Sequence, residues 1–465
     1  MNSLGNFRSR LVKHFIETGE DLLQPEIERL SLIMADKLKI DGKKIRMDSF
    51  MVSSSCKNLS RIELTYKVNY NFIKILNKLY PDELTITLKE YLKNGHKNDT
   101  VYRTRDIDSE SKLTFLLKQS AELFNVALDI NSEELITSEE FILLERLLND
   151  QIINNDSDND SDNDNYNNEN KVKIDEQEVE PKEGKDIKST SLQNPSDPDA
   201  TYRTKYGPNI GHVANITEVF DDDNRIYISY NYKPNIYSDT NFLRDFIEKQ
   251  NKSEWEIMLL VDGAYYSYQL SKEAKEKNIT LIPGELAGRK NNDKLPLTEH
   301  KIDSSTNEIS ECANGKKPEI STYDEEKEAY VAKFNKSDCE NCEYASTCTI
   351  KEQKKYNKLR FTKKQHERSD LRIQMETKEY GKLSNQRAGI EGAPSIFRRK
   401  YDVDNMHVRG LVRSKIEFGF KVLAANFKNF HKGIKRMEFF ALNYFFTIIM
   451  KKHFRIMNFS KISCF

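Results

Sequence analysis

The sequence predicts a mixed α/β fold, and three observations lead to that prediction. A hairpin pattern is followed by helix, strand, helix and strand up to residue 283, an alternation typical of a mixed sheet. Residues 45–52 and 255–261 predict buried strands, and Asp48 and Asp262 each follow a short apolar run, where a buried parallel strand would end. Stripes of apolar residues at helical spacing occupy much of the remaining chain.

The first half of the chain predicts helices around a single early strand. Residues 1–40 are predicted to be helical, residues 41–56 to hold the first strand of the core, and residues 57–149 to form a helical insertion. Residues 150–192 are rich in Asn, Asp and Ser. Because such a composition cannot bury enough apolar surface to offset the entropy of ordering, they are predicted to form a disordered acidic linker.

Residues 193–285 are predicted to contain the rest of the core. Apolar alternation on both sides of a turn at residues 221–224 predicts a hairpin. A helix capped by Ser238 or Asp239 follows, then a buried strand that ends at Asp262. A second helix, at about residues 267–277, leads to a strand stopped by Pro and Gly.

The C-terminal part is divided into three further regions. Residues 286–362 are predicted to be an insertion with a cysteine cluster, and residues 363–430 to hold basic helices. Within the latter, a helix of about residues 363–392 is expected to carry Glu391. Residues 431–465 form a tail that matches no expected pattern.

Composition limits the class of protein. The chain has 465 residues, of which 37% are hydrophobic and 32% charged, as expected of a soluble protein with two or three regions. Its net charge of -1 conceals a basic C-terminal quarter, because residues 351–465 hold 27 Lys and Arg against 10 Asp and Glu. A surface that binds a polyanion and a helical domain with exposed lysines both explain this asymmetry.

The sequence shows no targeting or membrane segment. The first residues lack the apolar core of a signal peptide. The longest apolar stretch, residues 439–450, is shorter than the roughly 20 residues that cross a bilayer. A cytoplasmic location without membrane attachment is the resulting expectation.

Four of the six cysteines form a candidate metal site. Cys339, Cys342 and Cys348 have the close spacing of a thiolate metal clip, and Cys312 is a candidate fourth ligand. Four thiolates suit a structural Zn2+ ion where disulfides are disfavoured. Reduced cysteines without a metal are the alternative.

Acidic residues at 48, 262 and 391 are the candidate catalytic groups. Three carboxylates can hold two divalent ions, which activate a nucleophile and stabilise a leaving oxyanion in phosphodiester transfer. Arg387 and Glu391 are four residues apart, so on a helix both side chains would share one face. Asp197 and Asp199 follow no strand and are interpreted as a structural turn.

Several short motifs of the sequence resemble those of a known family. They are Met47-Asp48-Ser49, Ser55-Cys56-Lys57-Asn58-Leu59-Ser60-Arg61, Ser196-Asp197-Pro198-Asp199-Ala200, Val261-Asp262-Gly263-Ala264-Tyr265-Tyr266-Ser267, Arg387-Ala388-Gly389-Ile390-Glu391-Gly392 and Val408-Arg409-Gly410-Leu411. Over roughly residues 5–430 the chain resembles DDE transposases of bacterial insertion sequences. The resemblance implies an RNase H-like mixed sheet with flanking helices, and a catalytic triad of Asp48, Asp262 and Glu391.

The resemblance also implies cofactors and partners. The three carboxylates would bind two Mg2+ or Mn2+ ions, and residues 1–40 would be the remnant of an N-terminal DNA-binding region. The partners would be double-stranded DNA, as transposon ends and target, and a second copy of the chain in a synaptic homodimer near the nucleoid. The expected DNA contacts are Arg387, Arg398, Arg399, Lys400 and Arg409.

Two other functions fit the same sequence. One is a truncated, catalytically inactive relic that binds DNA through its basic C-terminal region. The other is a related nuclease that hydrolyses DNA without strand transfer. Paired-end complexes on native gels would separate the first from a transposase, and joined products in a target plasmid would exclude the second.

Overall fold

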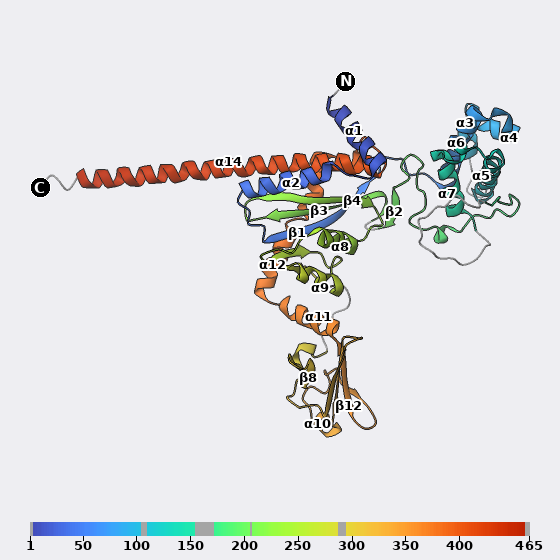
Figure 1. The fold of residues 1–465 in the computed structure, drawn as a ribbon. Coiled ribbons are helices and arrows are strands. Elements are labelled where there is room, and N and C mark those ends of the chain that lie inside the picture. Colours follow the sequence, from blue (N-terminus) through green and yellow to red (C-terminus); the bar gives the residue numbers. More distant parts are fainter. Residues whose placement is uncertain (1–2, 104–108, 154–171, 205–206, 287–293, 461–465) are drawn as a thin grey trace.

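The structure is a computed structural model that describes residues 3–103, 109–153, 172–204, 207–286 and 294–460, with side chains up to residue 439 (Figure 1). Most of the Asn- and Asp-rich segment that was predicted to be disordered, residues 154–171, lies outside these ranges. In the part of the chain described, no helix combines the length and the apolar character needed to cross a lipid bilayer.

A mixed sheet forms the centre of the molecule, so the expected α/β class is confirmed. Its strands are β1 (Lys44–Ser53), β2 (Thr201–Thr204), β3 (Pro208–Phe220), β4 (Arg225–Pro234), β5 (Ile257–Val261) and β6 (Ile279–Pro283). β3 lies between β4 and β1 in antiparallel pairing, and β1, β5 and β6 follow in parallel pairing. The predicted hairpin is therefore β3–β4, with its turn at residues 221–224.

Helices cover both faces of this sheet. They are α1 (Ser3–Thr18), α2 (Leu23–Lys37), α8 (Asp239–Lys249), α9 (Tyr268–Glu276), α12 (Lys378–Ala388), α13 (Gly392–Tyr401) and α14 (Leu411–Ser460). Alternate side chains of a strand face opposite ways. Met47 packs into the cluster that includes α8 and α9 residues, whereas Phe50 packs against Phe397 of α13 and Phe418 of α14.

The predicted cap of α8 is confirmed, because the Ser238 side chain accepts a hydrogen bond from the backbone N–H of Asn241. Such a cap satisfies one of the amide groups that a helix leaves without a partner at its start. The observed bounds of β5, α9 and β6 also lie within two residues of the sequence-based prediction.

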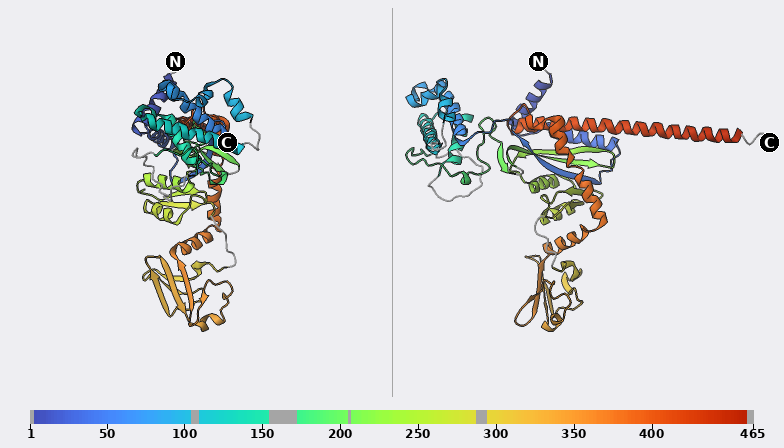
Figure 2. Two further views of the ribbon diagram at one scale, coloured as in Figure 1. Left: turned by 90° about the vertical axis from the view of Figure 1, so that its right-hand side faces the viewer. Right: turned by 180° about the vertical axis from the view of Figure 1, so that it is seen from behind.

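A helical insertion lies at one end of the sheet (Figures 1 and 2). It contains α3 (Arg61–Leu79), α4 (Ile86–Lys89), α5 (Ser109–Ile130), α6 (Glu133–Ile136) and α7 (Glu139–Gln151). The sequence analysis placed residues 172–192 in a linker. In the structure Val179 and Leu192 are buried in the core of this insertion, because scattered apolar residues give the segment anchors on the helices.

A second small unit lies on the opposite side of the sheet from α14 (Figure 2). We call residues 294–362 the cysteine subdomain. Its elements are β7 (Lys301–Asp303), β8 (Glu308–Glu311), β9 (Ile320–Asp324), β10 (Ala329–Phe334), α10 (Lys336–Glu340), β11 (Lys351–Glu352) and β12 (Asn357–Thr362). α11 (Lys363–Gln374) then returns the chain to α12 and the central sheet.

The structure corrects one predicted helix. The single helix expected over residues 363–392 is interrupted after α11 and again after α12. Glu391 lies in the turn before α13, where the N–H of Gly389 donates to Gln386 and that of Glu391 to Ala388. Glycines at 389 and 392 weaken the helical preference of this segment, which explains why it does not continue as one helix.

Candidate active site

Asp48 and Asp262 lie level with each other on neighbouring parallel strands. The last paired residues of β1 and β5 are Arg46 and Leu260, and each aspartate is two residues further on. Since side chains alternate along a strand, each aspartate faces the same side as the residue two before it. That side is covered by α12, because Leu260 packs against Tyr380.

The location of Asp48 differs from the prediction in one detail. Asp48 does not end its strand, because β1 continues to Ser53 through antiparallel pairing with β3. Only the parallel pairing with β5 stops before it. Asp262 does follow its strand directly, as predicted, and its Oδ1 accepts the N–H of Gly263 at 2.8 Å.

The environment of Asp48 favours its neutral form. The pKa of this carboxyl is raised from 3.8 to about 6, mainly by burial and also by the charges of Asp239 and Asp262. The N–H of Ser49, which donates to Asp48 Oδ1 at 2.9 Å, and the charge of Arg387 act in the opposite direction. Asp48 therefore has two negatively charged neighbours and one positively charged neighbour, an arrangement that suits a bound cation.

Arg387 lies between the aspartates and Glu391. Its side chain is 16% exposed and forms an ion pair with Glu391, which is 56% exposed. A Cβ on Gly284, just after β6, would lie 3.0 Å from Arg387 Nε, so the arginine passes directly over this glycine. Arg387 thus connects the end of the sheet to the turn that carries Glu391.

The three predicted carboxylates are not gathered into one group. Among the residues that the structure describes, no three His, Cys, Asp or Glu side chains form a group that could hold a metal ion. The charges of Asp262 and Arg387 act on Asp48, whereas Glu391 forms its ion pair with Arg387.

A buried arginine that the sequence analysis missed connects β1 to the turn of Glu391. Arg46 forms an ion pair with Glu218 of β3, whose side chain is fully buried, and also donates from Nη1 to the backbone carbonyl of Gln386. Its guanidinium lies 4.0 Å from the centre of the Phe220 ring and directly against Gly389. The signal in the sequence was a charged residue at each of two facing strand positions, which is rare in a buried sheet.

Ser49 and Asp239 form a further polar contact near the site. Ser49 Oγ donates to Asp239 Oδ1 at 2.5 Å, and Asp239 is 8% exposed at the start of α8. Asn215 donates to the Tyr265 hydroxyl at 2.7 Å and to the backbone carbonyl of Asp48 at 3.3 Å. These contacts fix the backbone of β1 at the aspartate.

The predicted DNA contacts occupy different places. Arg398 donates to the backbone carbonyl of Met51 at 2.7 Å and to Asp404 at 3.0 Å, so it supports the end of β1. Arg399 and Lys400 are exposed on α13.

Two of these cations lie beside other cations. The charge of Lys428, and then those of Lys432 and Arg225, lower the pKa of Lys400. Burial lowers the pKa of Lys67, and the charge of Arg409 lowers it further, so Arg409 lies beside the helical insertion.

Asp197 and Asp199 have structural contacts, in agreement with their interpretation as a turn. Asp197 is 1% exposed and accepts from Ser54 Oγ at 2.5 Å and from the N–H of Gly410 at 3.1 Å. Asp199 accepts from the N–H of Leu411 at 3.0 Å. Both aspartates attach the start of α14 to the core.

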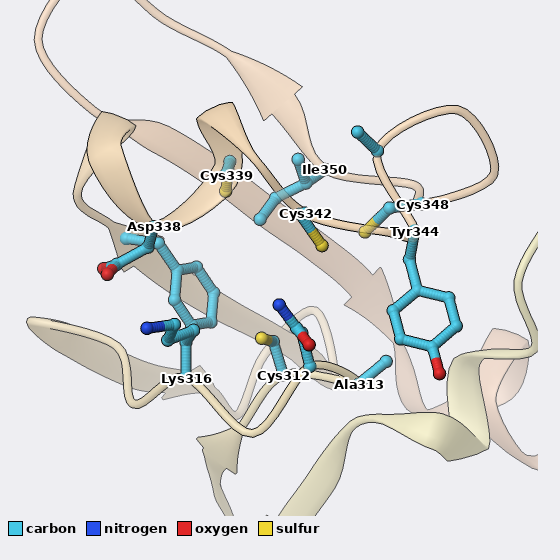
Figure 3. A pocket seen from close by; sticks show the side chains of 12 residues that line it. Cys312, Ala313, Lys316, Asp338, Cys339, Cys342, Tyr344, Cys348 and Ile350 are labelled. Carbon is cyan, nitrogen blue, oxygen red and sulfur yellow. The ribbon is translucent and has the colours of Figure 1, made fainter.

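The four candidate zinc ligands line one small cavity in the cysteine subdomain, which Figure 3 shows from close by. They are Cys312, Cys339, Cys342 and Cys348, and all four are free thiols. The cavity belongs to a different unit from the carboxylates, so the two predicted metal sites are separate.

Comparison with known proteins found a family model that matches part of the chain. Residues 311–431 match the model of a family described as "Transposase DDE domain". The matched region includes the cysteine cluster, Arg387 and Glu391, whereas Asp48 and Asp262 lie before it. No curated protein and no solved structure matches the chain.

Proposed function

Residues 311–431 carry the match to the transposase DDE domain that the sequence resemblance led us to expect, and from this we propose that the chain is a DDE transposase. It would cut and rejoin DNA at the ends of its own insertion sequence, using Asp48, Asp262 and Glu391. The observation that carries the proposal is the level placement of Asp48 and Asp262 on neighbouring parallel strands, facing the helix that bears Arg387.

The strand order supports an RNase H-like core. β4, β3, β1, β5 and β6 lie side by side in that order, with antiparallel pairing on one side of β1 and parallel pairing on the other. The central strand of this order carries the first proposed catalytic aspartate, and its parallel neighbour the second. Strands hold side chains in fixed positions, as a site that must align two reacting DNA groups requires.

The carboxylates fit divalent cations such as Mg2+ or Mn2+. Asp48 lies half-buried among negative neighbours, and hard cations prefer carboxylate oxygens. When bound, two such ions would activate the attacking oxygen and stabilise the leaving one. Asp48 and Asp262 would hold the ions from the sheet, and Glu391 would join them after its ion pair with Arg387 opens.

We propose that released Arg387 contacts a DNA phosphate. Its guanidinium already faces the negative charge of Asp48 and lies over Gly284 at the end of the sheet. An arginine can bind phosphate oxygens through two parallel N–H groups. If a DNA phosphate replaced Glu391 as the partner of Arg387, Glu391 would be free to join Asp48 and Asp262. DNA binding would then complete the set of three carboxylates.

DNA would also bind along α13 and the first part of α14. Lys400, Lys428 and Lys432 come from these two helices and lie close enough together to influence one another. Arg399 and Arg409 are exposed nearby in sequence and extend the proposed contact. Binding of this kind depends on phosphate charge and weakens with salt. Arg398 would instead support the end of β1 through its hydrogen bonds to Met51 and Asp404.

The experiment that tests the function is a cleavage assay with Mn2+ and a DNA fragment that carries the element's own ends. Asp48→Asn, Asp262→Asn and Glu391→Gln are each expected to abolish cleavage while DNA binding persists. Glu285→Gln is a control, since this residue follows β6 but has no proposed role. Full cleavage by any of the three variants would remove that residue from the triad.

The separation of Glu391 from the aspartates favours a second candidate, a protein that binds DNA without cutting it. Native gels with paired transposon ends separate the two. A transposase would form a complex of two chains with two ends and then cleave them, and joined products in a target plasmid would show strand transfer. Binding to single ends without cleavage would establish the second candidate instead.

A further inference from the structure

The cysteine subdomain has a small apolar core. One cluster contains six buried hydrophobic side chains, which are Ile309, Tyr330, Ala332, Phe334, Leu359 and Phe361. Its sheet has the order β11, β12, β10 and β9, and β7 pairs with β8 separately. Units with so little buried surface generally need a metal ion or disulfides in addition to their core.

Four thiols from separate segments meet beside this core. Cys312 directly follows β8, Cys339 belongs to α10, Cys342 follows that helix, and Cys348 precedes β11. Together they line a cavity of about 30 Å³, and Figure 3 shows their sulfur atoms around it. The gathering of these segments at one place depends on the fold, because Cys312 and Cys348 are far apart in the sequence.

Backbone hydrogen bonds hold the cysteines in tight turns. The N–H of Cys312 donates to Lys316 at 2.9 Å, and that of Gly315 to Cys312 at 2.8 Å. Gly315 has φ +71°, a conformation that favours glycine. The N–H of Cys342 donates to the backbone carbonyl of Cys339 at 3.4 Å, and the N–H of Cys348 donates to that of Tyr344 at 2.7 Å.

A buried histidine supports the first of these turns. His300 is 1% exposed, and its Nδ1 accepts the N–H of Ala313 at 3.2 Å. Its ring stacks on Phe361 at 6.0 Å between centroids. His300 therefore connects the Cys312 turn to the core. Comparable support from a neighbouring side chain orients ligands in many metal sites.

The remaining wall of the cavity is mostly apolar. Phe334, Ala345 and Ile350 contribute side chains to it. A metal ion bound here would convert the four thiols to thiolates, which are the form of cysteine that binds metal.

We propose that Cys312, Cys339, Cys342 and Cys348 bind one Zn2+ ion that stabilises the cysteine subdomain. Four thiolates complete the tetrahedral shell that Zn2+ prefers, which leaves no open position for catalysis. As placed in the structure, the four thiols line the cavity but do not form a group that could hold a metal ion. Binding therefore requires the side chains to turn inward until each sulfur is about 2.3 Å from the ion, and it releases four protons from the thiols. The proposal does not depend on the proposed transposase activity.

Metal analysis of the purified full chain tests the proposal. Wild type is expected to contain about one zinc ion per chain, as a closed structural site does. Cys342→Ser and Cys348→Ser are expected to lose it, whereas Cys56→Ser, which changes a cysteine outside the cavity, should retain it. Zinc that is absent from wild type, or unchanged in both cavity variants, would overturn the proposal.

A second measurement uses wild-type protein alone, so it tests the proposal even if the cysteine variants do not fold. Wild-type protein is stripped of metal and reloaded with Co2+, whose absorption spectrum reports tetrahedral thiolate ligation. The expected spectrum shows sulfur-to-cobalt bands, with hydrogen exchange slowed in β9, β10 and β12 relative to the metal-free chain. Cobalt bound without thiolate bands, or exchange unaffected by metal, would contradict a four-cysteine site. Neither readout requires DNA cleavage, so failure of the activity would leave this test intact.

Discussion

The guanidinium of Arg46 lies against the backbone of Gly389, so close that a side chain at position 389 would overlap it. The contact joins β1, two residues before Asp48, to the turn that carries Glu391. Arg46 also donates to Gln386, the residue before Arg387. The relative position of the first and third proposed carboxylates therefore depends on one buried arginine and one glycine.

Gly389→Ala is expected to displace this turn and reduce DNA cleavage at least tenfold. The added methyl group meets the Arg46 guanidinium, and overpacking of a buried contact typically costs about 1–3 kcal/mol. Cleavage rates and urea unfolding measure the two effects. Gly392→Ala is the matched control, since no atom lies within 4 Å of a Cβ there, and it should behave like wild type.

A double-variant cycle extends this test. Arg46→Met removes the guanidinium that would clash with a side chain at residue 389. Gly389→Ala should therefore reduce cleavage and stability less in the Arg46→Met protein than in wild type. Additive effects of the two substitutions would show that the contact does not position the turn.

Asp48→Asn is expected to stabilise the metal-free fold at pH 7 by about 1–3 kcal/mol, although it abolishes cleavage. Burial raises the folded pKa of Asp48 from 3.8 to about 6. A group with a raised folded pKa contributes its full stability below its unfolded pKa and loses that contribution as the pH rises through about 6. The asparagine has no charge to lose.

Urea unfolding in EDTA at pH 7 and at pH 4 measures this effect. The gain in stability of Asp48→Asn over wild type should be present at pH 7 and should largely disappear at pH 4, where the carboxyl is protonated in the folded wild type. If the stability difference between Asp48→Asn and wild type were the same at both pH values, the effect of the substitution would come from packing and not from charge.

Lys428→Ala is expected to weaken DNA binding several-fold for all sequences and to reduce the slope of log affinity against log salt by about one. The reason is that Lys428 lies beside Lys400 in the proposed phosphate surface. Fluorescence anisotropy at several salt concentrations measures both quantities. Lys13→Ala is the control, because Lys13 lies on α1 and pairs with Glu17, and it should leave the slope unchanged.

Arg398→Ala is expected to lower the free energy of unfolding by about 1 kcal/mol, because the side chain is partly exposed and a typical hydrogen bond contributes on that order. The side chain connects α13 to Met51 and Asp404, and Asp404 in turn accepts the N–H of Ser53. Arg399→Ala, one residue away and exposed, should not change stability. Equal free energies of unfolding for the two variants would show that Arg398 does not stabilise the fold.

The sequence by itself determined the local elements of this protein. Apolar alternation located the β3–β4 hairpin and its turn, and the Ser238 cap located the start of α8. The apolar run before Asp262 located β5 and the aspartate that follows it. These features depend on residues within a few positions of one another, so their spacing is visible in the chain.

The tertiary structure decided how distant residues meet. Arg46 reaches Glu218 and Gln386, which are 172 and 340 residues away, and no periodicity relates such positions. The interruption that places Glu391 in a turn, and the burial of Val179 and Leu192, likewise depend on which surface each segment packs against. Local spacing records which face of an element is apolar. Long-range ion pairs and close backbone contacts arise only once those faces are packed together.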